Sequence, residues 1–255
     1  MKTIEFMGLP GAGKTTLASV LLRTLRAKGM PVLSQAEAIN LCIRRRDDGI
    51  LINALKHLPK AWWEPCAGIQ KALPEMHRFS YRHVSLLHLI SSTIERNSLP
   101  ENWSESFLYT FFRQFAEHQL AEDYLQKQEV RVVEEGFLHR GFTLFGYLAA
   151  ASASDELLKR YVDSIPLPSA VIFIDVSPEE CWGRLQKRVE PPVPLKAREK
   201  GDAIGQLAVG HSCLQRIAAL SERKNITVLS VGNSQDEAIP LEKRLEAVVA
   251  SLGTY

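Results

Sequence analysis

The feature that most constrains this chain is the segment at residues 8–15, which reads Gly-Leu-Pro-Gly-Ala-Gly-Lys-Thr. It fits the pattern G-x-x-x-x-G-K-[ST], in which glycines leave backbone N–H groups open to phosphate oxygens. Residues 3–7 have the composition of a short strand, and apolar residues after the segment recur at helical spacing. A strand, a glycine-rich loop and a helix in this order predict a site for the phosphates of a nucleoside triphosphate.

Each residue type in this loop has a chemical role. We expect Lys14 to reach the β- and γ-phosphates and the Thr15 hydroxyl to bind Mg²⁺. The positive end of the following helix dipole would attract the same anion. A glycine-rich turn that binds nothing would need neither side chain. The predicted nucleotide-binding residues of the loop are Gly8, Pro10, Gly11, Ala12, Gly13, Lys14, Thr15 and Thr16.

Size and composition favour a cytoplasmic α/β protein. The 255 residues suit one domain with an elaboration or a small lid, and 45% of them are hydrophobic. No stretch approaches the roughly eighteen consecutive apolar residues of a membrane span, and the first strand begins too early for a signal peptide. The four cysteines are scattered, as expected of reduced thiols, and the net charge of +2 does not suggest nucleic-acid binding. We therefore expect neither nucleic acid nor membrane as a partner.

The first third of the chain contains weaker candidates for the second substrate. Residues 13–28 should be helix, ended by Gly29, and residues 31–35 should be the second strand. Glu37 follows that strand and could contact an acceptor or act as a base; alternatively, it is an acidic residue in the first turn of the next helix. Three arginines at residues 44–46 could hold an acceptor phosphate, or form a solvated helix end answered by their own aspartates.

The middle of the chain, from about residue 50 to 128, shows no convincing strand. We expect helices over residues 51–58, 83–96 and 103–128, with Arg78 among several arginines that could contact an acceptor. Aromatic residues here could stack on a flat ligand, although such residues more often form core. An apolar face over residues 107–120 could pack against a second copy of the chain.

The second informative stretch is residues 130–136, a β-branched strand that ends in acidic residues. A carboxylate at this place normally holds the metal ion. We assign Glu134 to Mg²⁺ and Glu135 to the acceptor or water, although the two could exchange roles. An acidic turn without function is the alternative. Arg140, one helical turn further, could meet the same site and contact the acceptor.

The last third supplies the predicted lid. After an expected helix at residues 141–162, residues 170–176 read as a buried strand. Ser177, Pro178 and Glu180 form a strong helix start, and that helix should carry Arg184 and Arg188 on one face. A proline-broken basic loop follows, so residues of about 184–203 could close over a triphosphate and exclude water. A solvated linker is the alternative. A helix at residues 203–224, a strand at 226–231 and a final helix complete the chain.

Four stretches together resemble the P-loop kinases of the nucleotide and nucleoside kinase group, which includes thymidylate, deoxynucleoside and adenylate kinases. They are residues 8–16, 130–140, 172–188 with the proline loop, and 228–233. The middle third is similar only in being helical. The resemblance implies a three-layer P-loop NTPase fold with five parallel strands in the order 2-3-1-4-5. It also implies that Arg184 and Arg188 are lid arginines and that Gly232 and Asn233 border the adenine.

One departure from this group concerns the acceptor. In these kinases the carboxylate after the third strand is often followed directly by arginine, whereas here Glu134 is followed by Glu135 and Gly136. Glu37 matches an acidic position of deoxynucleoside kinases only weakly, and no N-K-x-D motif suggests guanine. The departure leaves a sugar, an antibiotic or another metabolite as an alternative to a nucleoside acceptor.

We therefore predict one P-loop kinase-like domain over residues 1–255, with a helical acceptor-binding insertion at about 38–128 and a lid at about 184–203. The predicted activity is ATP- and Mg²⁺-dependent phosphoryl transfer to a small acceptor, with Lys14, Glu135, Arg184 and Arg188 as catalytic residues. A nucleotide-hydrolysing switch or assembly protein is one alternative. A sulfotransferase is another, which the intact Gly13-Lys14-Thr15 and the two arginines disfavour.

Overall fold

The structure is a computed structural model of the chain that describes residues 2–57, 71–97, 101–147, 153–188 and 200–232. The chain forms two compact units. One unit comprises Leu33–Arg131 together with Met1–Lys2, and the other comprises Thr3–Val32 together with Val132–Tyr255.

A five-stranded sheet has the order β2-β3-β1-β4-β5, which confirms the predicted strand order. The strands are β1 (Lys2–Gly8), β2 (Val32–Ser34), β3 (Val130–Val133), β4 (Ala170–Asp175) and β5 (Thr227–Gly232). β1 pairs in parallel with β4, so that Gly8 lies opposite Ile174, and β4 pairs in parallel with β5. Because parallel strands end at the same edge, the carboxyl ends of β1, β4 and β5 share that edge.

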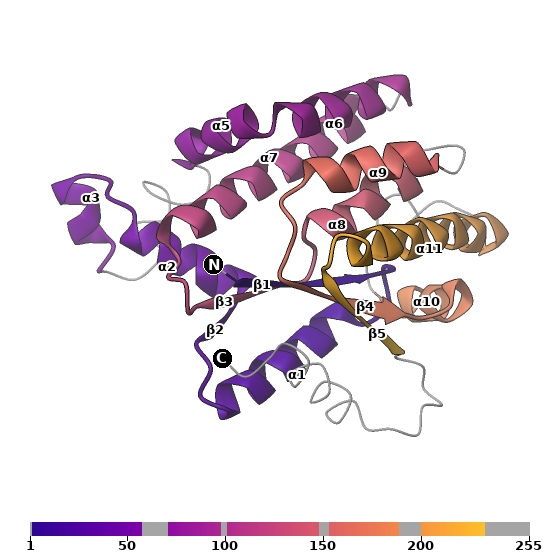
Figure 1. Cartoon of the computed structure of the whole chain (residues 1–255), viewed down its shortest axis with the longest axis horizontal. Helices are drawn as coiled ribbons and strands as arrows, with labels where there is room; N and C mark the ends of the chain where they lie inside the picture. The colour runs from indigo at the N-terminus through magenta and orange to yellow at the C-terminus, as the bar shows by residue number, and fades with distance from the viewer. Residues whose placement is uncertain (1, 58–70, 98–100, 148–152, 189–199, 233–255) are drawn as a thin grey trace. The chain divides into compact units, whose positions relative to one another are not determined.

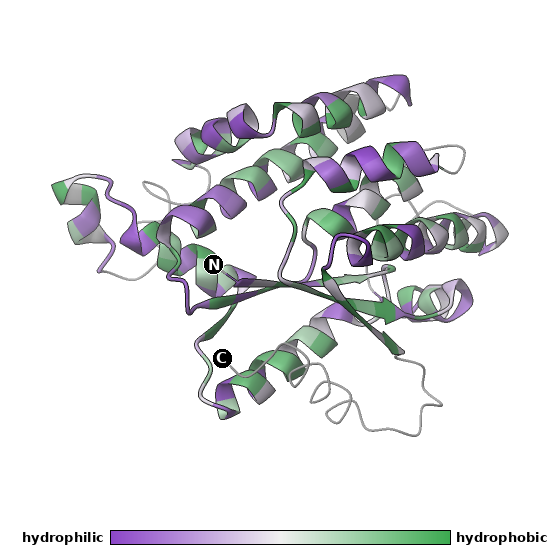
Figure 2. Cartoon of the chain, in the orientation of Figure 1, coloured by the Kyte–Doolittle hydropathy of each residue, from purple (hydrophilic) through white to green (hydrophobic). Residues whose placement is uncertain are grey.

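Helices cover both faces of the strands in the unit that contains the glycine-rich loop (Figure 1). α1 (Lys14–Ala27) lies on one face, and α8 (Phe137–Gly141), α9 (Asp155–Ser164) and α11 (Lys200–Glu222) lie on the other. β4 is buried from Ala170 to Ile174, as its unbroken apolar run predicts for a strand covered on both sides. Figure 2 shows this strand in the hydrophobic colour. This unit therefore has the three-layer α/β/α arrangement that was expected.

A single glycine determines where α1 ends. Gly29 has φ 75°, a conformation that side chains with a Cβ rarely adopt. Its N–H donates to Arg26 O at 2.9 Å, and the N–H of Met30 donates to Leu25 O at 3.1 Å. These two bonds form a Schellman motif, so Gly29 ends the helix as predicted.

The predicted continuous helix over residues 141–162 is wrong. α8 ends at Gly141, and a π-helical segment, η2 (Phe142–Tyr147), follows it directly. A separate helix, α9, then begins after Ser154, whose side chain accepts the N–H of Leu157. η2 packs on α11, where a Cβ added to Gly210 would overlap the Phe142 ring. The sequence concealed this arrangement because apolar periodicity does not distinguish a π-helical turn from an α-helical one.

In the other unit, most of the described residues between β2 and β3 are helical. The helices that the structure describes there are α2 (Gln35–Arg45), α3 (Ile50–Leu55), α5 (Leu73–Arg82), α6 (Val84–Arg96) and α7 (Glu101–Tyr124). α2 and α7 share a buried cluster that includes Ala38, Cys42, Leu120 and Ala121. Phe79 of α5 is fully buried and stacks on His83, so it is a core residue rather than a ligand-stacking one. Among the described residues, no helix is long and apolar enough to span a membrane.

We predict opposite effects for two glycine substitutions in α11. Gly210→Ala should lower the free energy of unfolding by about 1–3 kcal/mol, because the new methyl group would overlap Phe142. Gly205→Ala should leave stability unchanged or raise it by up to about 1 kcal/mol, because a Cβ at Gly205 meets nothing within 4 Å and alanine favours helix. Chemical denaturation of both variants measures the difference; equal stability would contradict the close packing of η2 on α11.

Candidate active site

The glycine-rich loop after β1 requires glycine for two separate reasons. Gly11 and Gly13 have φ 86° and 97°, in the left-handed region that favours glycine. A Cβ on Gly8 would lie 3.0 Å from Ile174 O, and a Cβ on Gly11 would lie 2.7 Å from Cys181 O. Pro10 is partly buried in this loop, and Thr16 is exposed in the first turn of α1. The loop thus has the backbone conformation that its sequence predicts, and it precedes the N-terminus of a helix.

Lys14 is folded back onto this loop. Its side chain is 8% exposed, and Nζ donates to Gly8 O at 3.1 Å and to Leu9 O at 3.2 Å. Burial lowers the pKa of Lys14, and the negative charge of Glu135, 3.9 Å away at Oε1, opposes that shift. The ammonium group is therefore held by carbonyl oxygens inside the loop that would surround a phosphate.

Thr15 and Glu134, the two residues predicted to hold a metal ion, are in direct contact. Thr15 Oγ1 donates to Glu134 Oε2 at 2.5 Å. A hydroxyl and a carboxylate are oxygen ligands of the kind that Mg²⁺ prefers, and Mg²⁺ usually takes its other ligands from phosphate and water. The donor set therefore fits Mg²⁺, with Thr15 and Glu134 as the residues that would hold it.

Glu135 lies among basic side chains. Its Oε2 is 3.3 Å from Arg140 Nη2, and its Oε1 is 3.7 Å from His139 Nε2 as well as 3.9 Å from Lys14 Nζ. Burial, with the charges of Lys14 and Arg140, lowers the pKa of His139 well below its usual value. Arg140 thus lies in contact with Glu135, whereas its binding of an acceptor stays a prediction.

Arg184 reaches the glycine-rich loop from α10 (Pro178–Leu185). This helix begins as predicted, with the Ser177 side chain accepting the N–H of Glu180 at 3.2 Å. Arg184 Nη1 donates to Ala12 O at 3.2 Å, and its Nη2 donates to Glu180 Oε1 at 2.6 Å. The guanidinium group therefore lies at the glycine-rich loop.

Arg188 is not placed as predicted, because α10 ends at Leu185 and does not carry both arginines on one helical face. The Arg188 side chain is exposed. Its positive charge is a minor contributor to the lowered pKa of Lys14, after burial. The rest of the predicted lid, residues 189–199, lies outside the described residues.

The predicted adenine border is described only in part. Gly232 is the last residue of β5 and lies opposite Asp175 of β4. It therefore lies at the carboxyl edge of the sheet, as expected. Asn233 lies outside the described residues.

Glu37 caps the N-terminus of α2 in the helical unit. Its Oε2 accepts the backbone N–H of Ser34 at 2.8 Å and the Ser34 hydroxyl at 2.7 Å, while the N–H of Glu37 donates to Ser34 Oγ. This reciprocal pair is a capping box at the start of α2. The alternative weighed from the sequence, an acidic residue in the first turn of the next helix, is the one observed.

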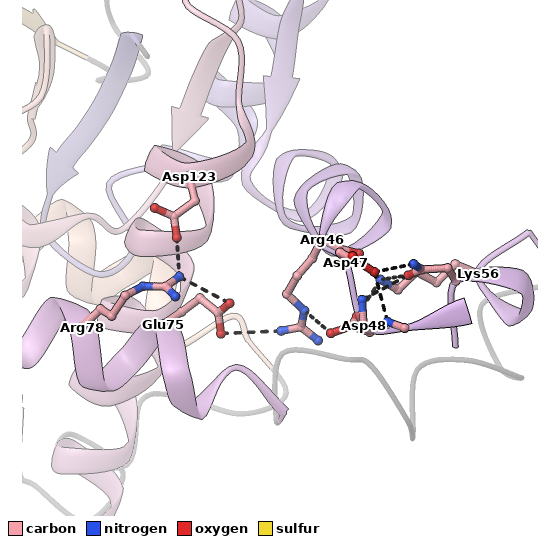
Figure 3. Close-up of polar contacts among 9 residues, drawn as sticks. Arg46, Asp47, Asp48, Lys56, Glu75, Arg78 and Asp123 are labelled. Atoms are coloured by element: carbon pink, nitrogen blue, oxygen red, sulfur yellow. Dashed lines mark hydrogen bonds and ion pairs between the residues drawn. The ribbon is translucent and has the colours of Figure 1, made fainter. Parts of the chain in front are cut away.

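Arg78 is also occupied by protein partners (Figure 3). Its Nη2 lies 2.5 Å from Asp123 Oδ2 and 3.6 Å from Glu75 Oε1. Glu75 Oε2 in turn lies 3.6 Å from Arg46 Nη1, and Arg46 Nε lies 2.8 Å from Asp48 Oδ1. An acceptor phosphate would have to displace a carboxylate from Arg78. Of the three arginines at residues 44–46, Arg46 pairs with an aspartate as the alternative expected, although it is buried rather than solvated, and Arg45 pairs with Glu129 at 2.7 Å.

Two buried polar residues near the loop were not predicted from the sequence. Glu5 of β1 is 3% exposed, and His139 of α8 is 3% exposed. Glu5 Oε1 accepts the backbone N–H of His139 at 2.7 Å. The available signal was a glutamate within an apolar strand, since a buried carboxylate normally has hydrogen-bonding partners.

No family model and no curated protein matches this chain. The chain is similar to solved structures of deoxyadenosine kinase from M. mycoides, with dCTP bound (10% identity, TM-score 0.48, 98% of both chains) and with dATP bound (11%, 0.44, 99% of both). It is also similar to shikimate kinase from Bacteroides thetaiotaomicron (12%, 0.41, 98% of both). The strand order of the sheet is observed in the structure itself and does not depend on this likeness.

The ion pairs of Glu75 with Arg46 and Arg78 lead to a prediction about the free energy of unfolding. Glu75→Gln should lower the free energy of unfolding by about 3 kcal/mol, because Arg46 would lose a carboxylate partner in a buried position. Glu95→Gln, on the exposed side of α6, should change it by less than about 0.5 kcal/mol. Urea denaturation of the two variants makes the comparison, and a near-neutral Glu75→Gln would show that the network does not stabilise the helical unit.

Proposed function

We propose that this chain is an ATP-dependent phosphotransferase that moves the γ-phosphate to a small acceptor, a nucleoside or nucleoside monophosphate being favoured. The observation that carries the proposal is the convergence of Lys14, the Thr15–Glu134 pair and Arg184 on one glycine-rich loop. Phosphoryl transfer needs chiefly positioning and charge neutralisation, and these side chains supply both.

The loop residues would bind the triphosphate through backbone N–H groups at the start of α1. Lys14 would exchange its carbonyl partners for phosphate oxygens, which carry more negative charge. Mg²⁺, held by Thr15 and Glu134, would neutralise charge on the phosphates. Gly232 and Asn233 would border the adenine.

The two arginines would stabilise the negative charge that develops during phosphoryl transfer. Arg184 already lies at the loop, and Arg188 follows it by one turn. With residues to about 203 they would form a lid that excludes water, so that the acceptor receives the phosphate instead. Glu135 would contact the acceptor hydroxyl or an ordered water, oriented by Arg140.

The acceptor would bind chiefly in the helical region of about residues 38–128, and Glu37, Arg78 and Arg140 are its proposed contacts. The local partners of Glu37 and Arg78 make them weaker candidates than Arg140, which lies at Glu135. The Glu135-Gly136 pair is the observation that keeps a sugar, an antibiotic or another metabolite as the second candidate acceptor. The protein would act in the cytoplasm as a single kinase domain, without nucleic acid or membrane as a partner.

Replacing the loop lysine tests the proposal. Lys14→Ala should reduce phosphoryl transfer by several orders of magnitude while the protein stays folded, because the positive charge at the β- and γ-phosphates is lost. Lys28→Ala, at the exposed opposite end of α1, should retain full activity. Turnover and circular dichroism of both variants are the measurements, and undiminished transfer by Lys14→Ala would overturn the proposal.

The acceptor class is decided by a panel assay. ADP release from Mg-ATP should rise when the right member of a set of nucleosides, nucleoside monophosphates, sugars and aminoglycosides is added. Product analysis by mass spectrometry should show the acceptor heavier by one phosphoryl group. Slow ADP release that no acceptor changes, together with nucleotide-dependent oligomerisation, would instead indicate a switch or assembly protein.

A further inference from the structure

The buried carboxylate of Glu5, on β1, caps the N-terminus of α8. α8 begins after Gly136, which has no side chain with which to cap the helix. The N–H of His139, the third residue of α8, donates instead to Glu5 Oε1 from β1 at 2.7 Å. Helix N-termini leave N–H groups without partners in the helix, and a carboxylate is a favourable acceptor there. The start of α8 is therefore tied to the strand that leads into the glycine-rich loop.

Gly136 is required by this contact. Its φ is −84°, which any residue can adopt, so the requirement is not conformational. A Cβ at Gly136 would overlap Glu5 Cδ and Oε2, and Glu5 is too deeply buried to move aside. A second bond holds the same turn, because Tyr161 Oη donates to Phe137 O at 2.5 Å. The first turn of α8 is thus fixed from β1 and from α9.

This turn continues directly from the two acidic residues of the site. Glu134, in contact with Thr15, and Glu135, between Lys14 and Arg140, immediately precede Gly136. His139 and Arg140, which contact Glu135, lie on α8 itself. A shift of α8 would therefore displace both carboxylates relative to the loop.

We propose that Glu5 is a positioning residue for Glu134 and Glu135: by capping α8 from β1, it holds the metal-binding carboxylate against Thr15. The inference rests on the proposed function for the role of Glu134. It explains why a charged residue occupies the apolar first strand and why Gly136 follows the acidic pair.

The test measures how nucleotide binding depends on Mg²⁺. Glu5→Leu, which removes the acceptor but keeps the size, should raise the Mg²⁺ concentration for half-maximal binding of a non-hydrolysable ATP analogue by about 10–100-fold. Binding of the same analogue in EDTA, which depends on the loop and Lys14, should change less than about threefold. Glu5→Gln keeps an oxygen that accepts the His139 N–H, so it should restore a Mg²⁺ dependence within about threefold of that of the unaltered protein.

Two further variants separate positioning from general destabilisation. Leu25→Ala, in the buried C-terminal half of α1, should lower stability by about 2–5 kcal/mol without changing the Mg²⁺ dependence. Gly136→Ala should raise the Mg²⁺ requirement as Glu5→Leu does, and it serves if Glu5→Leu fails to fold. Isothermal titration calorimetry measures each binding constant, and thermal denaturation measures stability.

Three results would overturn the inference: unchanged Mg²⁺ dependence in Glu5→Leu or Gly136→Ala, equal impairment in Glu5→Gln, or equal impairment in Leu25→Ala. Nucleotide binding that does not depend on Mg²⁺ in the unaltered protein would also overturn it. Because the measurement is binding rather than turnover, it is independent of the acceptor assay. A protein that transfers no phosphate but loses Mg²⁺-dependent binding in Glu5→Leu would contradict the kinase proposal and support the positioning role.

Discussion

The hydrogen bond between Thr15 and Glu134 joins the glycine-rich loop to the carboxylate that follows β3. These residues are far apart in the sequence, and they meet because β3 and β1 are neighbours in the sheet. Thr15 follows the loop after β1, and Glu134 follows β3, so parallel strands bring both to one edge. A different strand order would leave a phosphate-binding loop without a carboxylate for a metal ion.

Two polar side chains buried around this edge are each hydrogen-bonded to other parts of the protein. Lys14 is held by carbonyl oxygens of the loop, and Glu5 is held by the N–H of His139. A buried charge without partners costs several kcal/mol, so each of these side chains requires its own hydrogen-bonding partners in place. Burial lowers the pKa of His139 and so favours its neutral form, which adds no further positive charge beside Arg140. Hydrogen bonds to protein partners thus fix these side chains at the loop, which suits a reaction that needs positioning more than bond-making chemistry.

The helical unit shows how local contacts limit sequence interpretation. Glu37 closes a capping box with Ser34, and Arg78 pairs with Asp123 and Glu75. Both residues looked available for an acceptor because a sequence displays charges but not their partners. Capping boxes have a readable spacing, S/T-x-x-E, so Glu37 could have been assigned from the pattern alone. The pairing of Arg78 with Asp123 could not, because it joins two helices that are distant in the chain.

The sequence by itself determined the glycine-rich loop, the start of α10 at Ser177 and the end of α1 at Gly29, and its resemblance to P-loop kinases gave the strand order. The loop and the helix ends rest on local backbone chemistry, in which a positive φ, a capping side chain or a lysine at fixed spacing leaves a recognisable pattern. Only the tertiary structure decided that α8 gives way to a π-helical segment, that Arg184 rather than Arg188 contacts the loop, and that Glu5 caps α8. Those outcomes depend on which atoms approach one another across the fold, and sequence spacing carries no measure of such distances.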